Sequence, residues 1–310
     1  MGWNHNFMGV ANANIGEIDG LELLFIKSVN GVYTNPTEKG YIYGGYGPSG
    51  CMSDCDEFDP NTWTSKTSMP SPVRSDAAAS TILTKGYIYG GNSEWSCLPD
   101  CDEYAPDTWT NRTNLSPGRM GLSASTISDK GYVYAGYCSS NIYQDCDEYD
   151  PDSWTSKTDM PSPARRSLSS STISDKGYVY GGYNGGALAD CDEYDPDSWT
   201  SKTSMSPARH WFTATTINDK GYLFSGRGSV WLSDCDEYNP DTWTAKTNVP
   251  SPIRNYLASS TIDDKGYIYG GDDNSNRLQD CDEYDPDTWT AKSNMPSPGR
   301  SYLSASSIST

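Results

Sequence analysis

The chain lacks any apolar run close to the roughly 20 residues that a helix needs to cross a bilayer, although it is 310 residues long. Its first residues, Met-Gly-Trp-Asn-His-Asn, also lack the basic region and apolar core of a secretion signal. We therefore expect neither membrane insertion nor classical secretion. The expected location is the cytoplasm or an assembled particle.

Basic residues are scarce too: 22 lysines and arginines face 41 acidic residues, and the net charge is −19. Phosphates would be repelled over most of such a surface, which argues against a nucleic-acid partner. Helix-forming residues are few in most of the chain, whereas Tyr, Thr, Ser, Gly and Trp are abundant, which favours strands and turns.

What the chain does have is one acidic phrase, Asp-Cys-Asp-Glu-Tyr-Asp-Pro-Asp-Ser-Trp at residues 145–154, with near-copies elsewhere that make six in all. Its cysteine recurs every 44 to 46 residues, at Cys55, Cys101, Cys146, Cys191, Cys235 and Cys281. A period in this range is typical of propellers and solenoids.

Each repeat contains four short strand signals, as residues 169–201 illustrate. Strands are expected at 169–173, 178–180, 191–194 and from Trp199. An Asp-Lys-Gly turn at 175–177 and an Asp-Pro-Asp turn at 195–197 separate the first from the second and the third from the fourth. Extended Met-Pro-Ser-Pro segments such as residues 160–163 link the repeats. The pattern predicts an all-β, six-bladed propeller over residues 39–310, after an arm at residues 1–38.

The order of the strand signals also predicts how the ring closes. The first repeat begins at Lys39 with a second strand, and the chain ends in a first strand near residues 301–308. The C-terminal strand should therefore complete the first blade, in a three-plus-one closure.

The repeat resembles the Kelch family over residues 39–310, through Gly44-Gly45, Tyr149-Asp150-Pro151, Trp154 and Arg165. The chain departs from the pattern at Ala135, Ser225, Phe58 and Ala105. The resemblance implies a propeller that binds partners at one mouth. A copper site like that of galactose oxidase needs two histidines, and the propeller holds only His210, so we exclude it.

The arm has its own weak signals. Residues 21–26 suggest a strand, Asn30-Gly31 suggests a turn, and residues 15–32 resemble short phrases in bacteriophage structural proteins. The resemblance implies an arm that anchors the propeller to other particle subunits. A strand that merely covers a sheet edge is the alternative.

The repeated motif residues have structural and functional interpretations. The six repeated cysteines suggest packing, and the extra Cys51, Cys97 and Cys138 could each bridge to the repeat cysteine that follows (Cys55, Cys101 and Cys146), although reduced thiols are expected. Asp54 and Asp56 are weak candidates for calcium, against a solvated acidic face with no metal or other cofactor. The repeated arginines (Arg74, Arg119, Arg165, Arg209, Arg254, Arg300) could bind an anion or pair with a neighbouring blade.

Residues that break the repeat are the best candidates for a partner-binding face, because packing does not dictate them. They are Tyr46, Asp76, Asn92, Trp95, Tyr137, Tyr143, Arg166, Tyr183, His210, Trp211, Arg227, Trp231, Tyr256, Asp272 and Tyr302. Aromatic and polar side chains together suit a protein or glycan ligand. No catalytic motif is evident.

We therefore predict a non-enzymatic binding or structural propeller, a decoration or host-attachment protein of a phage-like virion. The alternatives are a cellular Kelch protein-interaction module and a sugar-modifying enzyme similar to a mutarotase, for which Asp76, Arg166, His210 and Arg227 could supply ionisable groups.

Overall fold

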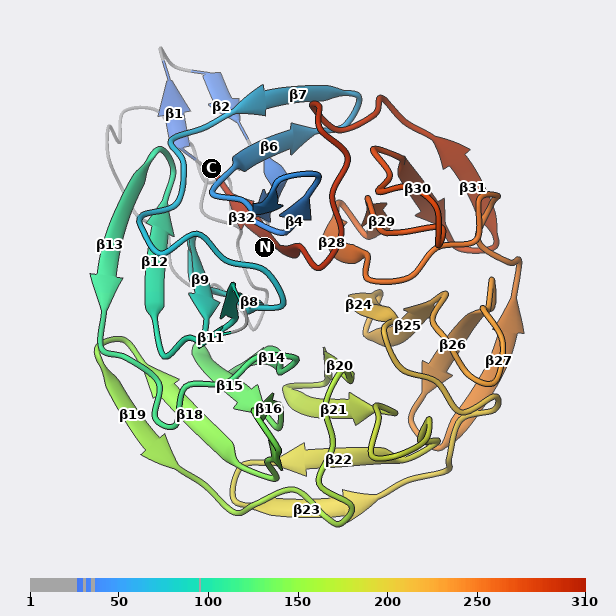
Figure 1. The fold of residues 1–310 in the computed structure, drawn as a ribbon. Coiled ribbons are helices and arrows are strands. Elements are labelled where there is room, and N and C mark those ends of the chain that lie inside the picture. The colour runs from blue at the N-terminus through green and yellow to red at the C-terminus, as the bar shows by residue number, and fades with distance from the viewer. Residues whose placement is uncertain (1–26, 30–31, 35–36, 95) are drawn as a thin grey trace, which may run out of the picture.

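Six four-stranded antiparallel sheets surround a central channel in the computed structural model, which describes residues 27–29, 32–34, 37–94 and 96–310 (Figure 1). The predicted six-bladed, all-β propeller is confirmed. The described residues contain no helix that could span a membrane.

Five blades are continuous in sequence and run from the channel outward. They are blade 2, β8 (Ala78–Ile82), β9 (Lys85–Tyr89), β12 (Cys101–Ala105) and β13 (Thr108–Arg112); blade 3, β14 (Ser123–Ile127), β15 (Lys130–Tyr134), β18 (Cys146–Asp150) and β19 (Ser153–Ser156); blade 4, β20 (Ser169–Ile173), β21 (Lys176–Tyr180), β22 (Cys191–Asp195) and β23 (Ser198–Ser201); blade 5, β24 (Thr213–Ile217), β25 (Lys220–Phe224), β26 (Cys235–Asn239) and β27 (Thr242–Lys246); and blade 6, β28 (Ala258–Ile262), β29 (Lys265–Tyr269), β30 (Cys281–Asp285) and β31 (Thr288–Ala291).

Blade 1 joins the two ends of the propeller. Its innermost strand is the C-terminal β32 (Ser304–Ser309), which pairs with β3 (Glu38–Tyr43), followed by β6 (Cys55–Asp59) and β7 (Thr62–Ser65). The register runs from Glu38↔Ser309 to Tyr43↔Ser304. The predicted three-plus-one closure is thus present.

Six two-residue strands lie in the loops as three pairs. These are β4 (Tyr46–Gly47) with β5 (Gly50–Cys51), β10 (Asn92–Ser93) with β11 (Ser96–Cys97), and β16 (Tyr137–Cys138) with β17 (Asn141–Ile142). In the arm, β1 (Lys27–Val29) pairs with β2 (Val32–Thr34) in antiparallel register, and the predicted Asn30-Gly31 turn lies outside the described residues. The strand suggested at residues 21–26 lies outside the described residues.

Aromatic side chains fill the space between adjacent blades. Tyr149 of blade 3 packs against Tyr87 and Tyr89 of blade 2, with ring centroids 5.4 and 5.6 Å apart. Trp154 covers Tyr149 and donates its indole N–H to the carbonyl of Thr113 in blade 2, at 2.7 Å. Because the same contacts recur around the ring, each blade buries its face against a near-copy of itself.

Two carboxylates of the acidic motif are buried rather than solvated. Its second aspartate accepts a hydrogen bond from the repeated arginine that precedes the first strand of the same blade, as Asp192 does from Arg165, whose side chain is fully buried. Its glutamate is also buried. Burial alone would raise the pKa of Glu148, but hydrogen bonds from Lys130, Tyr132 and Lys157 lower that pKa to about 2. The Arg165 side chain therefore pairs within its own blade rather than with a neighbouring blade, while its carbonyl accepts the Gly136 N–H of blade 3 at 3.2 Å. The expectation of a solvated acidic face is wrong for these two positions.

The turn between the first and second strands differs from the prediction. The residues with positive φ are Ser174 (48°) and Asp175 (58°), whereas Lys176 and Gly177 already belong to β21. Gly177 is needed for another reason, because the Tyr134 hydroxyl of the preceding blade occupies the space that a Cβ would fill. The proline linkers also differ from extended chain, since each contains a bend and a cis Ser-Pro bond such as Ser162-Pro163.

Candidate functional site

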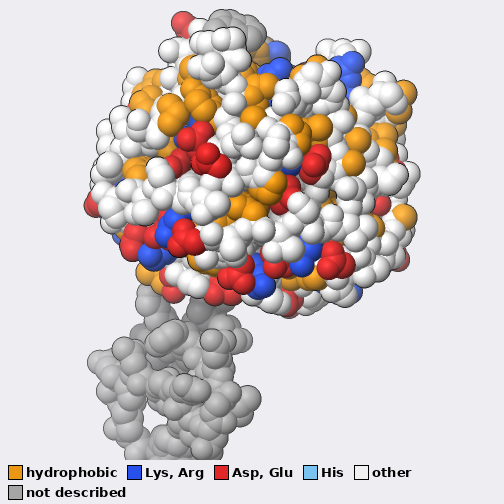
Figure 2. All heavy atoms as spheres, turned by 90° about the horizontal axis from the view of Figure 1, so that it is seen from below, with side chains coloured by type: hydrophobic (Ala, Val, Ile, Leu, Met, Phe, Trp, Pro, Cys, Tyr) orange, Lys and Arg blue, Asp and Glu red, His pale blue; other side chains and the backbone are white. Residues whose placement is uncertain are grey.

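The face of the propeller that carries the loops between second and third strands, here called the loop face, gathers most of the residues that break the repeat. There the residue after the glycine pair bridges to the residue after the repeated arginine, in pairs such as Arg166↔Tyr183 and His210↔Arg227. The opposite turn face carries the turns between first and second and between third and fourth strands. Charged residues of both signs lie along the lower edge of the molecule in Figure 2.

A closed ring of backbone hydrogen bonds frames the channel at the loop face. Its members have φ between 54° and 61°, and each N–H donates to the carbonyl of its counterpart in the preceding blade at 2.8–3.1 Å. They are Asp76, Gly121, Ser167, Trp211, Tyr256 and Tyr302. Because the ring satisfies these backbone groups, its side chains are free to vary, and they alone set the character of the channel mouth.

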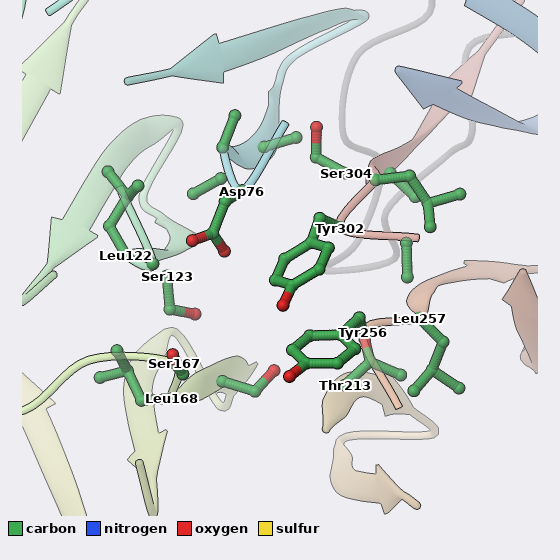
Figure 3. Close-up of a pocket in the computed structure, with 18 of the residues that line it drawn as sticks. Asp76, Leu122, Ser123, Ser167, Leu168, Thr213, Tyr256, Leu257, Tyr302 and Ser304 are labelled. Atoms are coloured by element: carbon green, nitrogen blue, oxygen red, sulfur yellow. The ribbon is translucent and has the colours of Figure 1, made fainter. Parts of the chain in front are cut away.

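The side chains of this ring leave the mouth half covered. Tyr256 and Tyr302 stack with centroids 3.9 Å apart, and Trp211 lies 4.5 Å from Tyr256. Figure 3 shows the Asp76 carboxylate and the Tyr302 hydroxyl pointing into the same opening. Burial raises the pKa of Asp76 from 3.8 to about 6, against the opposing effect of the Arg166 charge.

Two cavities open on the loop face beside this mouth. One, of about 740 Å³, is lined by Tyr46, Asp76, Asn92, Tyr137, Arg227, Trp231, Tyr256, Asp272 and Tyr302 among others. The second, of about 680 Å³, is lined by Arg166, Tyr183, His210, Trp211 and again Arg227. These lists contain every predicted site residue except Tyr143, which lies beside neither cavity, and Trp95, which lies outside the described residues.

Three arginines on this face have no carboxylate partner among the described residues. The guanidinium carbon of Arg166 lies 4.2 Å from the Tyr137 ring centroid, that of Arg227 lies 5.6 Å from Trp211, and that of Arg277 lies 4.7 Å from Tyr46. Every other lysine or arginine from 37 to 310 forms an ion pair with Asp or Glu. The unpaired positive charge of an acidic protein is therefore concentrated at these cavities.

His210 is poorly arranged for proton transfer. Burial, together with the charges of Arg227 and Arg166, lowers its pKa to about 4, so the imidazole is neutral at pH 7. Its Nδ1 atom is buried and has no hydrogen-bond partner among the described residues. The ring instead packs against Trp211 at 4.2 Å, in an aromatic arc that continues to Tyr183 at 4.9 Å.

The cysteines at the rim of the loop face pair differently from the sequence expectation. Cys97 of blade 2 forms a disulfide with Cys138 of blade 3, with Cα atoms 5.7 Å apart. The expectation of reduced thiols is wrong for Cys97 and Cys138. The alternative bridges, Cys97 to Cys101 and Cys138 to Cys146, do not form either, because Cys101 and Cys146 are buried free thiols between blades. Cys51 is also free and does not bridge to Cys55.

Asp56, one of the two weak calcium candidates, has other side-chain partners. Its carboxylate accepts hydrogen bonds from Arg300 and from Ser65, the latter at 2.8 Å. At Asp54 the backbone carbonyl accepts the Gly44 N–H at 2.8 Å. Within the part of the chain that the structure describes, no three His, Cys, Asp or Glu side chains are grouped as a metal site.

Arg277 is the main loop-face residue that the sequence interpretation missed. It lines the larger cavity and faces Asp272 across the blade 6 loop. It is neither aromatic nor at a repeat position, the two features on which the sequence prediction of this face rests. An arginine in a loop of a chain with few basic residues was the signal that could have identified it.

The architecture and site geometry define a six-bladed β-propeller with a polar and aromatic cavity face. The solved structure of YjhT shares this fold, with a TM-score of 0.69 and 16% identity over 83% of this chain and 98% of that one. No protein-family profile and no curated protein sequence matches the chain.

Proposed function

We propose that the chain is a non-enzymatic binding propeller that its N-terminal arm attaches to a larger particle, as a decoration or host-attachment protein of a phage-like virion. Two sequence features support this proposal: the Kelch-type repeat, and the resemblance of residues 15–32 to short segments of bacteriophage structural proteins. The observation that carries it is that the N-terminal arm joins one face of the propeller while the cavities open on the opposite face.

The chain enters and leaves the propeller on the turn face. Thr37 and Thr310 exchange backbone hydrogen bonds of 3.2 and 3.0 Å beside the Glu38 end of β3. Since strand β3 then runs across the blade, the loop after it lies on the loop face, where the cavities are. An arm joined at Thr37 can hold the propeller to a surface while the cavities stay accessible.

The loop face supports binding rather than catalysis. His210, the single histidine of residues 37–310, is neutral at pH 7, and its buried Nδ1 atom has no hydrogen-bond partner among the described residues that would suit it to proton transfer. Three arginines lie over aromatic rings, an arrangement that supplies charge and contact area to a ligand.

Deletion of residues 1–34 tests the proposal. Full-length chain and the truncated chain would each be produced in cells that assemble the particle, and purified particles would be probed with an antibody against the propeller. We expect the truncated propeller to fold, with an unchanged melting temperature, and to be absent from particles. Equal incorporation of both chains, or absence of both, would refute the proposal.

A sugar-modifying activity is the second candidate, because Asp76 has a pKa of about 6 at the channel mouth. Anomer exchange of neutral and acidic sugars, followed by NMR with the protein and with Asp76→Asn, tests it. Acceleration that the substitution removes would favour the enzyme.

A further inference from the structure

The three arginines without a carboxylate partner lie on three consecutive blades, one on each blade. Arg166 belongs to the blade 4 segment, Arg227 to blade 5 and Arg277 to blade 6. Arg227 lines both cavities, so the three charges border one continuous path across the face. A partner that crosses these blades meets a cation on each of them.

The guanidinium groups are held in place without being neutralised. Arg166 lies between two rings, 4.2 Å from the centroid of Tyr137 and 5.3 Å from that of Tyr183. Stacking on a ring restricts the side chain while leaving its in-plane N–H donors available. The Nε atom of Arg277 is buried and lacks a hydrogen-bond partner in the described structure. Such donors suit carboxylate or sulfate oxygens.

Acidic groups lie between the arginines along the same path. Asp76, Asp272 and Glu94 line the larger cavity together with Asn92. These acceptors would repel a densely charged acidic peptide, but they can accept hydrogen bonds from sugar hydroxyls. Aromatic rings next to them, Trp211 and Trp231, offer flat apolar surfaces for the C–H face of a pyranose.

From this alternation we infer that the loop face binds an extended acidic polysaccharide, whose spaced carboxylates or sulfates pair with Arg166, Arg227 and Arg277 while its hydroxyls reach the acidic side chains. The inference rests on the proposed binding function and specifies its ligand.

The test measures binding of the full chain to hexasaccharides from polygalacturonate, alginate and heparin by calorimetry. Matched neutral probes are the carboxyl-reduced and desulfated forms of the same oligosaccharides, and poly-glutamate serves as the acidic peptide. We expect at least one acidic hexasaccharide to bind, its neutral form to bind at least about tenfold more weakly, and affinity to fall with added salt.

Substitutions then assign the contacts. Arg227→Gln should weaken binding of the acidic probe about tenfold or more, and Arg227→Lys should weaken it less. Lys130→Gln removes one charge from an ion pair with Glu148 in β18 and should leave binding unchanged. Circular dichroism of each variant controls for folding.

Several results would overturn the inference: no binding to any acidic hexasaccharide, equal binding of the neutral forms, tighter binding of poly-glutamate, or monosaccharides that bind as tightly as hexasaccharides. Particle incorporation does not enter these measurements. Failure of the glycan inference is therefore distinguishable from failure of the arm-mediated attachment.

Discussion

Removal of the closing strand should unfold the propeller, because β32 is the innermost strand of blade 1 and a neighbour of two other blades. Deletion of residues 300–310 removes a six-pair register with β3. It also removes the buried side chains of Ile308, fully buried, and Leu303, 6% exposed, and leaves Asp56 without its Arg300 partner.

The expected cost is comparable with the whole stability of a domain. Roughly six backbone hydrogen bonds at about 1 kcal/mol each, with two buried aliphatic side chains at about 1.5–3 kcal/mol each, amount to about 10 kcal/mol. A typical domain is stable by only about 5–15 kcal/mol. The truncated chain should therefore lose its cooperative urea transition, followed by tryptophan fluorescence, and expand in small-angle scattering.

Milder variants keep the test interpretable if the truncated chain aggregates. Ile308→Ala should lower the free energy of unfolding by about 2–5 kcal/mol, whereas Ser309→Ala, at an exposed position of the same strand, should change it by less than about 0.5 kcal/mol. A synthetic peptide of residues 300–310 should restore the transition of the truncated chain. A truncated chain that unfolds as late and as cooperatively as the full chain would refute the closure reasoning.

Three other perturbations have expected outcomes. Because burial raises the pKa of Asp76 from 3.8 to about 6, the folded state binds more protons within that window and stability falls as pH rises through it. Asp76→Asn should therefore raise the unfolding free energy at pH 7, by up to about 3 kcal/mol, and flatten the melting temperature between pH 4 and 6. Ser93→Cys should form a second inter-blade disulfide with Cys51, detectable by peptide mapping without reduction. Arg165→Met should destabilise by about 3 kcal/mol or more because Asp192 stays buried without its cationic partner, and the double variant with Asp192→Asn should recover part of the loss.

The disulfide prediction follows from equivalent loop positions. Cys51 faces Tyr46 across its hairpin as Cys97 faces Asn92, and Ser93 occupies the position of Cys138. The next residues, Glu94 and Ser139, share positive φ values of 49° and 54°. A free Cys51 in Ser93→Cys under oxidising conditions would contradict this equivalence. For Asp76→Asn the contradicting result is an unchanged pH dependence, and for the Arg165 variant an unchanged urea midpoint.

Much of the fold could be predicted because each blade repeats the same packing problem. A period of 44 to 46 residues with four strand signals allows few architectures, and a first strand left over at the C-terminus must pair with the incomplete first blade. The role of the repeated cysteine was also predictable, since a residue that recurs at the same strand position in every blade packs in the core. Cys101, for example, is 1% exposed, and burial raises its pKa to about 12.

Contacts between blades were harder to predict, because they join residues about 40 positions apart in sequence. Whether two such residues meet depends on how neighbouring sheets are tilted, which sets where each residue lies along the channel axis. Cys97 therefore meets Cys138 rather than the nearer Cys101. For the same reason, repeat breaking indicated which residues share the loop face but could not show that Arg277 lies over Tyr46. The spacing also could not show whether a glycine serves a turn or a close approach, and Gly177 serves the latter.

The sequence by itself determined the ring: number of blades, strand order, closure and the residues that packing leaves free. The repeat encodes these because near-identical blades bury near-identical faces. Only the tertiary structure decided which charges are neutralised. The arginine before the first strand of each blade enters the interface and meets an aspartate, whereas Arg166, one residue after Arg165, emerges on the loop face without one. That one-residue step separates a structural ion pair from a cation available to a ligand.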